Sequence, residues 1–158
     1  MLLACQRAPQ ETVTERANAD DVISVTADDP EMLHAFSKAR ETLGSFLRLV
    51  ESKDRRVDTP SVKVKIEDDG KVEYFWIADL AVTGTNFSGN IDNDPDTVHS
   101  VKLGQRITFT KSQIYDWTYV DSTSQRTIGN FTACALLTHE SPKDAAEFRA
   151  KYRLACDT

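Results

Sequence analysis

Apolar and polar residues alternate one by one along much of the middle of the chain. After Pro60, the residues Val62, Val64 and Ile66 are separated by charged residues, and this period of two is typical of a strand with one buried face. The Asp-Asp-Gly sequence at 68–70 predicts a tight hairpin turn, because glycine readily adopts a positive φ. Turns this short join antiparallel neighbours, since a parallel connection needs a dozen or more residues. The middle of the chain is therefore expected to form an antiparallel sheet.

Six segments of the chain have the character of strands. We expect them at 62–67, 72–78, 85–91, 107–109, 115–119 and 127–137. Several of these segments carry apolar residues on both faces. This pattern indicates that both sides of the sheet are partly covered, as they are in a strongly curved sheet.

Helical patterns flank the strands. The Asp-Asp-Pro-Glu sequence at 28–31 supplies a capping side chain and a proline suited to a first helical turn. Apolar residues then recur at intervals of three and four along 32–50, although Gly44 and Ser45 are expected to break this helix. A second helix is expected at about 142–155.

This order of elements predicts an α+β fold. We expect an antiparallel, strongly curved meander of about six strands, with an N-terminal helix packed on it and a C-terminal helix. At 158 residues the chain is expected to hold one folded domain, which we place at 25–158.

The start of the chain resembles the end of a bacterial lipoprotein signal. Leu-Leu-Ala-Cys at 2–5 has the spacing of a lipobox, in which Cys5 becomes the lipidated first residue. A signal peptide has a basic and an apolar region before this point. We therefore expect 1–5 to be the remnant of a longer signal and 6–24 to be a flexible polar linker. The alternative is a chance match at the start of a cytoplasmic protein.

The charge balance limits the kinds of partner. The formal net charge is −6, whereas a general nucleic-acid binder needs a basic surface to displace counterions. No run of about 18 apolar residues occurs, so a lipid on Cys5 is the one expected contact with a membrane. The predicted location is the periplasmic side of the bacterial envelope.

Motifs of catalysis and metal binding are missing from the sequence. It contains no phosphate-binding glycine loop, zinc-protease motif or serine-hydrolase motif. His34, His99 and His139 are scattered, and the cysteines form no C-x-x-C pair. The acids at 92–96 lack the later Gly and Glu of a calcium-binding loop. We expect no metal, no cofactor and no enzymatic activity.

Aromatic residues supply the candidates for binding. Tyr115, Trp117 and Tyr119 share one face of the fifth predicted strand, and Trp76 lies in the second. Grooves lined by Trp and Tyr are typical of recognition surfaces, but the same residues also pack in cores. Asp116 has two interpretations: it holds a ligand cation with a raised pKa, or it accepts backbone N–H groups and fixes a turn.

The remaining cysteines are candidates for a disulfide. With Cys5 lipidated, Cys134 and Cys156 form an even pair, which favours a bridge in an oxidising compartment. We place Cys134 in the last strand and Cys156 just beyond the last helix, which returns the chain alongside that strand. The alternative is a buried, unpaired Cys134 and a frayed Cys156.

Several short motifs together resemble a known family. They are Asp29-Pro30-Glu31-Met32, Ala39-Arg40-Glu41-Thr42-Leu43, Phe46-Leu47, Phe75-Trp76-Ile77, Leu103-Gly104, Ile107 with Phe109, Ile114 with Asp116-Trp117 and Tyr119-Val120, and Gly129-Asn130-Phe131-Thr132. On these motifs the chain is similar to the YegJ-like family of small bacterial proteins, a domain of unknown function (2314). It departs at Gly44, where relatives tend to have proline. The resemblance implies a fold and a bacterial origin, and it brings no activity, cofactor or catalytic residue.

Three classes of function follow from these observations. The favoured class is a non-enzymatic binding or accessory lipoprotein that uses the sheet face near Trp76, Trp117 and Tyr119 to meet a protein partner. The alternative is an immunity-type protein that caps a toxin or another protein, which a small acidic domain would suit. A hydrolytic enzyme is favoured least, because it would need Asp116 and a histidine to meet in one cleft.

Overall fold

The computed structural model describes residues 29–157. The lipobox-like start with Cys5, the expected linker at 6–24 and residues 25–28 lie outside the described residues. In chain order the elements are α2 (Pro30–Glu51), β1 (Val57–Asp68), β2 (Lys71–Thr83), β3 (Asn86–Ile91), β4 (Arg106–Thr110), the short 3-10 helix η1 (Lys111–Gln113), β5 (Ile114–Asp121), β6 (Thr127–Gly129), α3 (Phe131–Leu137) and α4 (Pro142–Tyr152).

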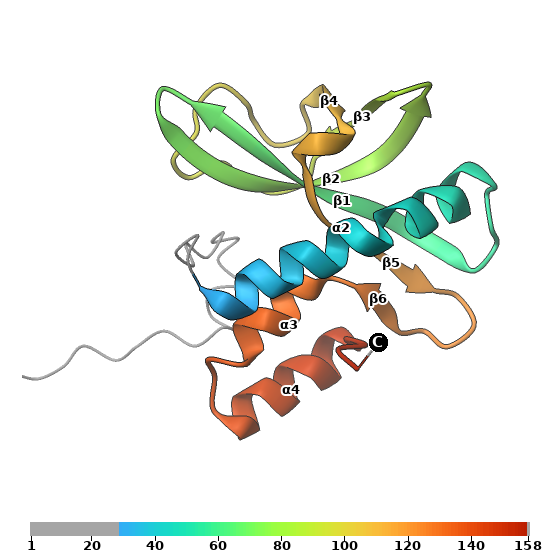
Figure 1. Ribbon diagram of the computed structural model, residues 1–158, viewed down its shortest axis with the longest axis vertical. Helices are drawn as coiled ribbons and strands as arrows, with labels where there is room; N and C mark the ends of the chain where they lie inside the picture. Colours follow the sequence, from blue (N-terminus) through green and yellow to red (C-terminus); the bar gives the residue numbers. More distant parts are fainter. Residues whose placement is uncertain (1–28, 158) are drawn as a thin grey trace, which may run out of the picture.

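The six strands form one antiparallel sheet, which confirms the predicted α+β class. Their order across the sheet is β4-β3-β2-β1-β5-β6. β1 to β4 follow one another as a meander, and the chain then returns to the centre, where β5 pairs with β1. The sheet is strongly curled, with α2 laid across it and with α3 and α4 on its β6 side (Figure 1).

Two bulges account for much of the curvature. Thr59 in β1 has a φ of 45° and Asp79 in β2 has a φ of 50°, and the strand register shifts at both positions. The pairing of β1 with β2 extends only as far as Val62 and Ile77. Since a bulge bends its strand and increases the twist, β1 leaves this point beside β5 while β2 leaves it beside β3. The sheet therefore opens into two lobes that share its centre.

The N-terminal helix begins as predicted but has no break. The Oδ1 atom of Asp29 accepts the N–H of Met32 at 3.0 Å and caps the helix. The buried stripe consists of Met32, Ala35, Ala39, Leu43, Phe46 and Leu47. The predicted break at Gly44-Ser45 is wrong, since all 22 residues form one helix. A glycine inside a helix reduces the stability by about 1 kcal/mol. Burial of one large apolar side chain of the stripe adds about 1.5–3 kcal/mol, so the buried stripe outweighs the glycine.

The predicted sixth strand is wrong beyond its first three residues. β6 ends at Gly129, and the apolar run from Phe131 to Leu137 is the helix α3. Gly129 (φ 78°) and Asn130 (φ 54°) turn the chain between the two elements. A Cβ atom at Gly129 would collide with the backbone and ring of Trp117, so the close approach requires glycine. A short apolar run does not by itself distinguish a strand from a helix.

The predicted disulfide between Cys134 and Cys156 is confirmed, with the two Cα atoms 5.6 Å apart. Its setting differs from the prediction, because Cys134 lies in α3 and not in a strand. α4 also ends before Ala155, since Arg153 adopts a left-handed conformation. The N–H of Thr127 donates to the carbonyl of Arg153, and the N–H of Ala155 donates to the carbonyl of Thr127. The C-terminal segment therefore lies beside β6.

Candidate functional site

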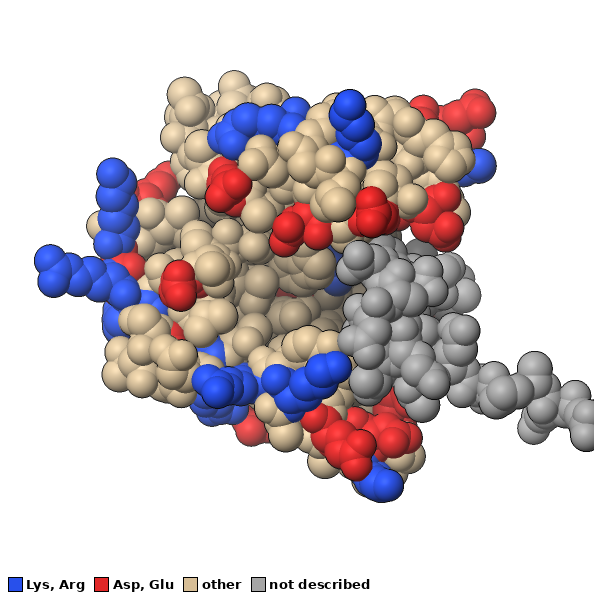
Figure 2. Space-filling model, turned by 180° about the vertical axis from the view of Figure 1, so that it is seen from behind, with Lys and Arg blue, Asp and Glu red and all other residues tan. Residues whose placement is uncertain are grey.

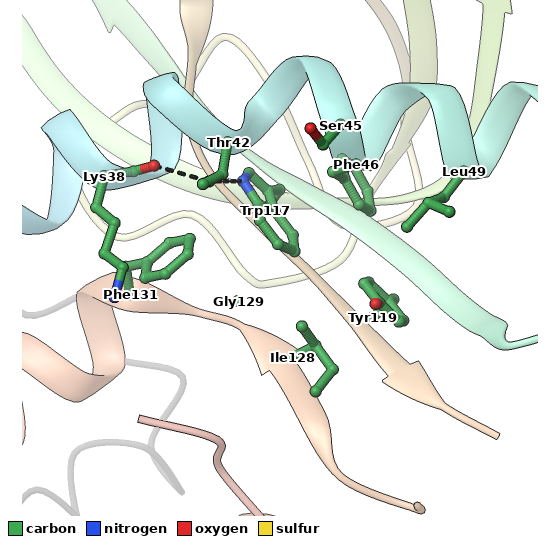
Figure 3. Close-up of a pocket in the computed structure, with 10 residues that line it drawn as sticks. All are labelled: Lys38, Thr42, Ser45, Phe46, Leu49, Trp117, Tyr119, Ile128, Gly129 and Phe131. Carbon is green, nitrogen blue, oxygen red and sulfur yellow. Dashed lines mark hydrogen bonds between the residues drawn. The ribbon is translucent and has the colours of Figure 1, made fainter. Parts of the chain in front are cut away.

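An open apolar groove lies between α2 and the hairpin of β5 and β6 (Figure 3). Its volume is about 240 Å³. The lining residues are Lys38, Thr42, Ser45, Phe46, Leu49, Trp117, Tyr119, Ile128, Gly129 and Phe131. We call this feature the aromatic groove. It contains two of the predicted binding residues, Trp117 and Tyr119.

Trp117 forms the floor of the aromatic groove and also belongs to the core. Its ring stacks on Phe46 at 4.8 Å between centroids and lies 6.2 Å from Tyr119, and its side chain is only 6% exposed. Its Nε1–H donates to the carbonyl of Ala39 and to the Oγ1 of Thr42, both at 3.1 Å. Trp117 therefore fixes α2, which is one wall of the groove, to the sheet.

Asp116 fixes the opposite wall. Its carboxylate is completely buried and accepts the backbone N–H groups of Trp117 at 2.8 Å, Phe131 at 3.2 Å and Thr132 at 2.8 Å. It also accepts the hydroxyl of Thr132 at 2.7 Å. These bonds satisfy the first N–H groups of α3 from outside the helix, as an N-cap side chain does from within. Of the two interpretations of Asp116, this geometry matches the one in which it accepts backbone N–H groups.

Lys63 completes a buried polar network with Asp116. The two residues are cross-strand neighbours in β1 and β5, and the Nζ of Lys63 donates to the Oγ1 of Thr132 at 2.6 Å. The same ammonium lies 4.7 Å from the ring centroid of Trp76. Burial raises the pKa of Asp116, and the charge of Lys63 and the hydrogen bonds oppose that shift. Burial lowers the pKa of Lys63, against the opposing charge of Asp116. We call these three groups the Lys63–Thr132–Asp116 network.

The other two aromatic candidates lie elsewhere. Tyr115 packs against Phe36 at 5.1 Å and Tyr74 at 5.2 Å between ring centroids, with the guanidinium of Arg40 5.0 Å from its ring. Trp76 does not line the aromatic groove either. The predicted binding residues are thus divided among separate places, and Trp117 and Tyr119 share the aromatic groove.

Strand register explains why the two tryptophans separate. Lys63 of β1 is opposite both Trp76 and Asp116, whereas Val62 is opposite Trp117. Because successive side chains of a strand point to opposite faces, Trp76 and Trp117 occupy different faces of the sheet. Seen from behind, the molecule is hollowed at its centre, with acidic residues above the hollow and basic residues below it (Figure 2).

Two further titratable groups hold a helix start and a loop. The Nε2 of His139 lies 2.8 Å from a carboxylate oxygen of Asp29 at the start of α2. The buried carboxylate of Glu73 accepts the backbone N–H groups of 96–98 at 2.9–3.0 Å and holds that loop. Between residues 29 and 157 there is no cluster of three or more His, Cys, Asp or Glu side chains that would hold a metal ion. None of the helices in this range has the length and apolar character needed to cross a bilayer.

Sequence reasoning missed several residues that build the site. Lys63 alternates with Val62 and Val64, so it reads as a solvent-facing residue of a half-buried strand. The sequence pattern predicts a strand at Phe131 and Thr132, whereas in the structure these two residues begin the helix α3 and offer their free N–H groups. The one available signal was Asn130, which favours left-handed turns more than most residues do.

Comparisons with known proteins place the chain among bacterial relatives. A family model described as "Uncharacterized protein conserved in bacteria (DUF2314)" matches residues 29–155. The chain is 33% identical to the Escherichia coli (strain K12) protein "Uncharacterized protein YegJ", over 84% of each chain. It is 30% identical to a "Putative ankyrin repeat protein" of Neisseria meningitidis serogroup B, over 60% of this chain and 40% of that one. No solved structure gives a significant match.

Proposed function

The chain belongs to the DUF2314 family of proteins conserved in bacteria, and on that premise we propose that it is a non-enzymatic module that binds a segment of a partner protein in the aromatic groove. The observation that carries the proposal is the groove itself. It is an open, apolar concavity with a Trp and a Tyr on its floor. Two neighbouring residues of β5 fix its walls, since Trp117 donates a hydrogen bond to α2 and Asp116 accepts one from α3.

The size of the aromatic groove favours side chains over a cofactor. Its volume of about 240 Å³ is below the roughly 300–1,000 Å³ typical of sites for small molecules and cofactors. One or two apolar side chains of a peptide segment are a better match for that space. Trp and Tyr are also enriched among the residues that contribute most to protein–protein affinity.

The polar groups nearby support binding over catalysis. Asp116 is enclosed, and its oxygens are occupied by backbone and hydroxyl donors. Thr132, the hydroxyl between Lys63 and Asp116, is only 2% exposed. A general base must come within hydrogen-bonding reach of a substrate, which these groups do not do. We therefore assign the network to positioning the groove wall that contains Phe131.

The relative from Neisseria meningitidis supports a protein as the partner. It bears the name of an ankyrin repeat protein, and the match covers 40% of its length. Ankyrin repeats stack into extended concave surfaces that bind other molecules. A segment similar to this chain in a protein of that name is consistent with a role in protein recognition.

The proposal includes the bacterial envelope as the location. A disulfide between Cys134 and Cys156 suits an oxidising compartment, because thiols of cytosolic proteins are generally kept reduced. A lipid on Cys5 would then hold the module at a membrane surface.

When the chain is expressed behind a lipoprotein signal, we expect wild type in the membrane fraction and Cys5→Ser in the soluble envelope fraction. Identical fractionation of the two would refute lipidation.

Filling the groove tests the function. Ser45 is an exposed residue of α2 that lines the groove, so Ser45→Trp places a ring in it without disturbing the core. Ser37→Trp is the matched control, because Ser37 is exposed on the same helix and does not line the groove. Short random peptides displayed on phage are selected on wild type. We expect the enriched peptides to bind Ser37→Trp as well and to lose binding to Ser45→Trp.

Melting temperatures of both variants show that each is folded before binding is compared. Peptides that bind the two serine variants equally would place recognition outside the groove and overturn the proposed function. Absence of any enriched peptide would do the same.

A further inference from the structure

The wall that α2 gives to the aromatic groove is one continuous stripe of the helix. Lys38, Thr42, Ser45 and Leu49 follow one another at intervals of four, three and four residues, so they share one face of α2 (Figure 3). With a rise of about 1.5 Å per residue, this stripe extends for about 16 Å along the helix axis. The groove therefore has a long straight wall, against which another helix can lie side by side with α2.

The strands at the groove leave no continuous edge for an extended segment. β5, which forms the floor, pairs with β1 on one side and with β6 on the other. On the outer side of the short strand β6, Thr127 exchanges backbone hydrogen bonds with Arg153 and Ala155. A segment bound here in extended form would thus find no strand among residues 29–157 to pair with, and a buried backbone group without a partner is unfavourable.

Polar groups on the floor and on the α2 wall are also occupied from within the protein. The Nε1–H of Trp117 donates to the carbonyl of Ala39 and to the hydroxyl of Thr42. That hydroxyl in turn donates to the carbonyl of Lys38 at 2.7 Å. The floor therefore offers no ring N–H to the carbonyls of an extended or polyproline segment, which has no internal hydrogen bonds. A helix pairs its own backbone groups and presents only side chains to the groove.

From these contacts we infer that the segment bound in the aromatic groove is an amphipathic helix of a partner protein, lying alongside α2. This inference rests on the proposed function and names the form and chemistry of the ligand. Apolar side chains spaced three and four residues apart in the bound helix pack on the floor made by Trp117 and Tyr119, as in other complexes of a helix with a groove.

Arg48 adds a charge preference at the rim of the groove. Its Nη2–H donates to the hydroxyl of Ser45 at 2.9 Å, which places the guanidinium beside the lining. None of the carboxylates of residues 29–157 forms an ion pair with it. A carboxylate on the polar face of the bound helix complements this cation. Since exposed ion pairs contribute little to affinity, the charge orients the helix and the apolar face supplies the binding.

The test uses two phage-displayed libraries of peptides of equal length that carry the same apolar and acidic residues. The helical library spaces the apolar residues three and four apart in an alanine-rich sequence. The extended library places them at alternate positions between prolines, which prevent a helix. Both are selected on wild type. Clones that bind Ser37→Trp and fail to bind Ser45→Trp are counted as groove-dependent.

We expect the groove-dependent clones to come from the helical library. A proline in the middle of an enriched peptide, at a position on its polar face, should weaken binding about a hundredfold, whereas alanine there should leave the Kd unchanged. Arg48→Glu should weaken binding of the acidic clones about threefold. Arg40→Glu is the matched control, because Arg40 is an exposed cation of the same helix that does not line the groove. Thermal melts establish that the variants are folded.

Different outcomes separate this inference from the proposed function. Groove-dependent clones from the extended library, or an enriched peptide that keeps its affinity with the central proline, overturn the helical ligand and leave the proposed function standing. Equal Kd values for Arg48→Glu and Arg40→Glu overturn the acidic residue of the bound helix. If neither library yields a groove-dependent clone, the helical ligand is overturned, and the selection from fully random peptides decides the proposed function by itself.

Discussion

Two buried carboxylates, Asp116 and Glu73, hold two different parts of the molecule by the same means. Each accepts three backbone N–H groups and a threonine hydroxyl. Asp116 faces Lys63 across a strand pair, whereas Glu73 has no salt bridge among residues 29–157. Asp116 joins β5 to the start of α3, and Glu73 joins β2 to a loop.

The comparison of Asp116 with Glu73 shows what the ammonium of Lys63 contributes. Glu73 indicates that backbone N–H groups and one hydroxyl suffice, without a neighbouring cation, to keep a buried carboxylate in place. The ammonium of Lys63 donates to the hydroxyl of Thr132, which in turn donates to Asp116, and through this one hydroxyl it links β1, α3 and β5. We interpret the network as the set of contacts that holds the groove wall in place. The contacts of Glu73 hold a single loop.

The largest effect is expected from Asp116→Ala. The change removes the acceptor for the first N–H groups of α3 and leaves the ammonium of Lys63 uncompensated. Breaking a buried pair on one side costs about 3–5 kcal/mol, and urea denaturation measures this loss of unfolding free energy. The double variant Asp116→Ala with Lys63→Met should recover part of it. A loss below about 1 kcal/mol in the single variant would contradict the role of the network.

A smaller, local effect is expected from Glu73→Ala. The N–H groups of 96–98 lose their acceptor, which costs about 1–3 kcal/mol when no other partner replaces it. Amide hydrogen exchange should become faster at Val98, while peptide binding in the aromatic groove stays unchanged. If the variant instead weakened groove binding as much as Asp116→Ala does, the two carboxylates would not act on separate parts.

Lys63→Met leaves Asp116, like Glu73, as a buried carboxylate without a neighbouring cation. The N–H groups and the hydroxyl of Thr132 remain as donors, so we expect a loss of only about 1 kcal/mol, that of one hydrogen bond. The pKa of Asp116 should rise further, because the charge of Lys63 now lowers it. Urea denaturation of wild type and variant side by side measures the cost. A cost as large as that of Asp116→Ala would show that the carboxylate depends on its cation.

The smallest effect concerns a carboxylate at the surface. Hydrogen bonds from the side chain and backbone of Arg56 lower the pKa of Asp54 from 3.8 to about 2. A carboxyl group whose pKa is lower in the folded state stabilises the fold at pH values above its pKa in the unfolded chain. This contribution is lost as the pH falls through its pKa in the folded state. The melting temperature of wild type should therefore exceed that of Asp54→Asn at pH 5 and converge with it between about pH 4 and pH 2. A constant difference over that range would refute the shift.

Local patterns were sufficient for much of the fold. The alternation from Val62 to Ile66 predicted β1, and the Asp-Asp-Gly turn predicted its hairpin with β2, in which Asp69 and Gly70 both have positive φ. Asp29 was correctly placed before the first helix. The disulfide was predicted as well, although from a wrong position for Cys134. Apart from the disulfide, whose cysteines are 22 residues apart, each of these features depends on residues close together in sequence.

Long-range contacts explain what the sequence did not predict. α3 begins where it does because Asp116, fifteen residues earlier, accepts its first N–H groups. β5 returns to the centre of the sheet, where it brings Asp116 beside Lys63. This return depends on pairing between strands that are far apart in sequence. The aromatic groove needs α2 and β6 side by side, so only its floor residues Trp117 and Tyr119 could be proposed in advance.

The C-terminal segment covers part of the outer edge of β6. β6 is an outer strand, and an outer strand with free backbone groups is a template for pairing with another copy. Leu154 forms a parallel bridge with Thr127, and the neighbouring disulfide at Cys156 keeps that short segment in place. Reduction would free this edge of the sheet. We therefore expect the disulfide to limit edge-to-edge aggregation in addition to stabilising the fold.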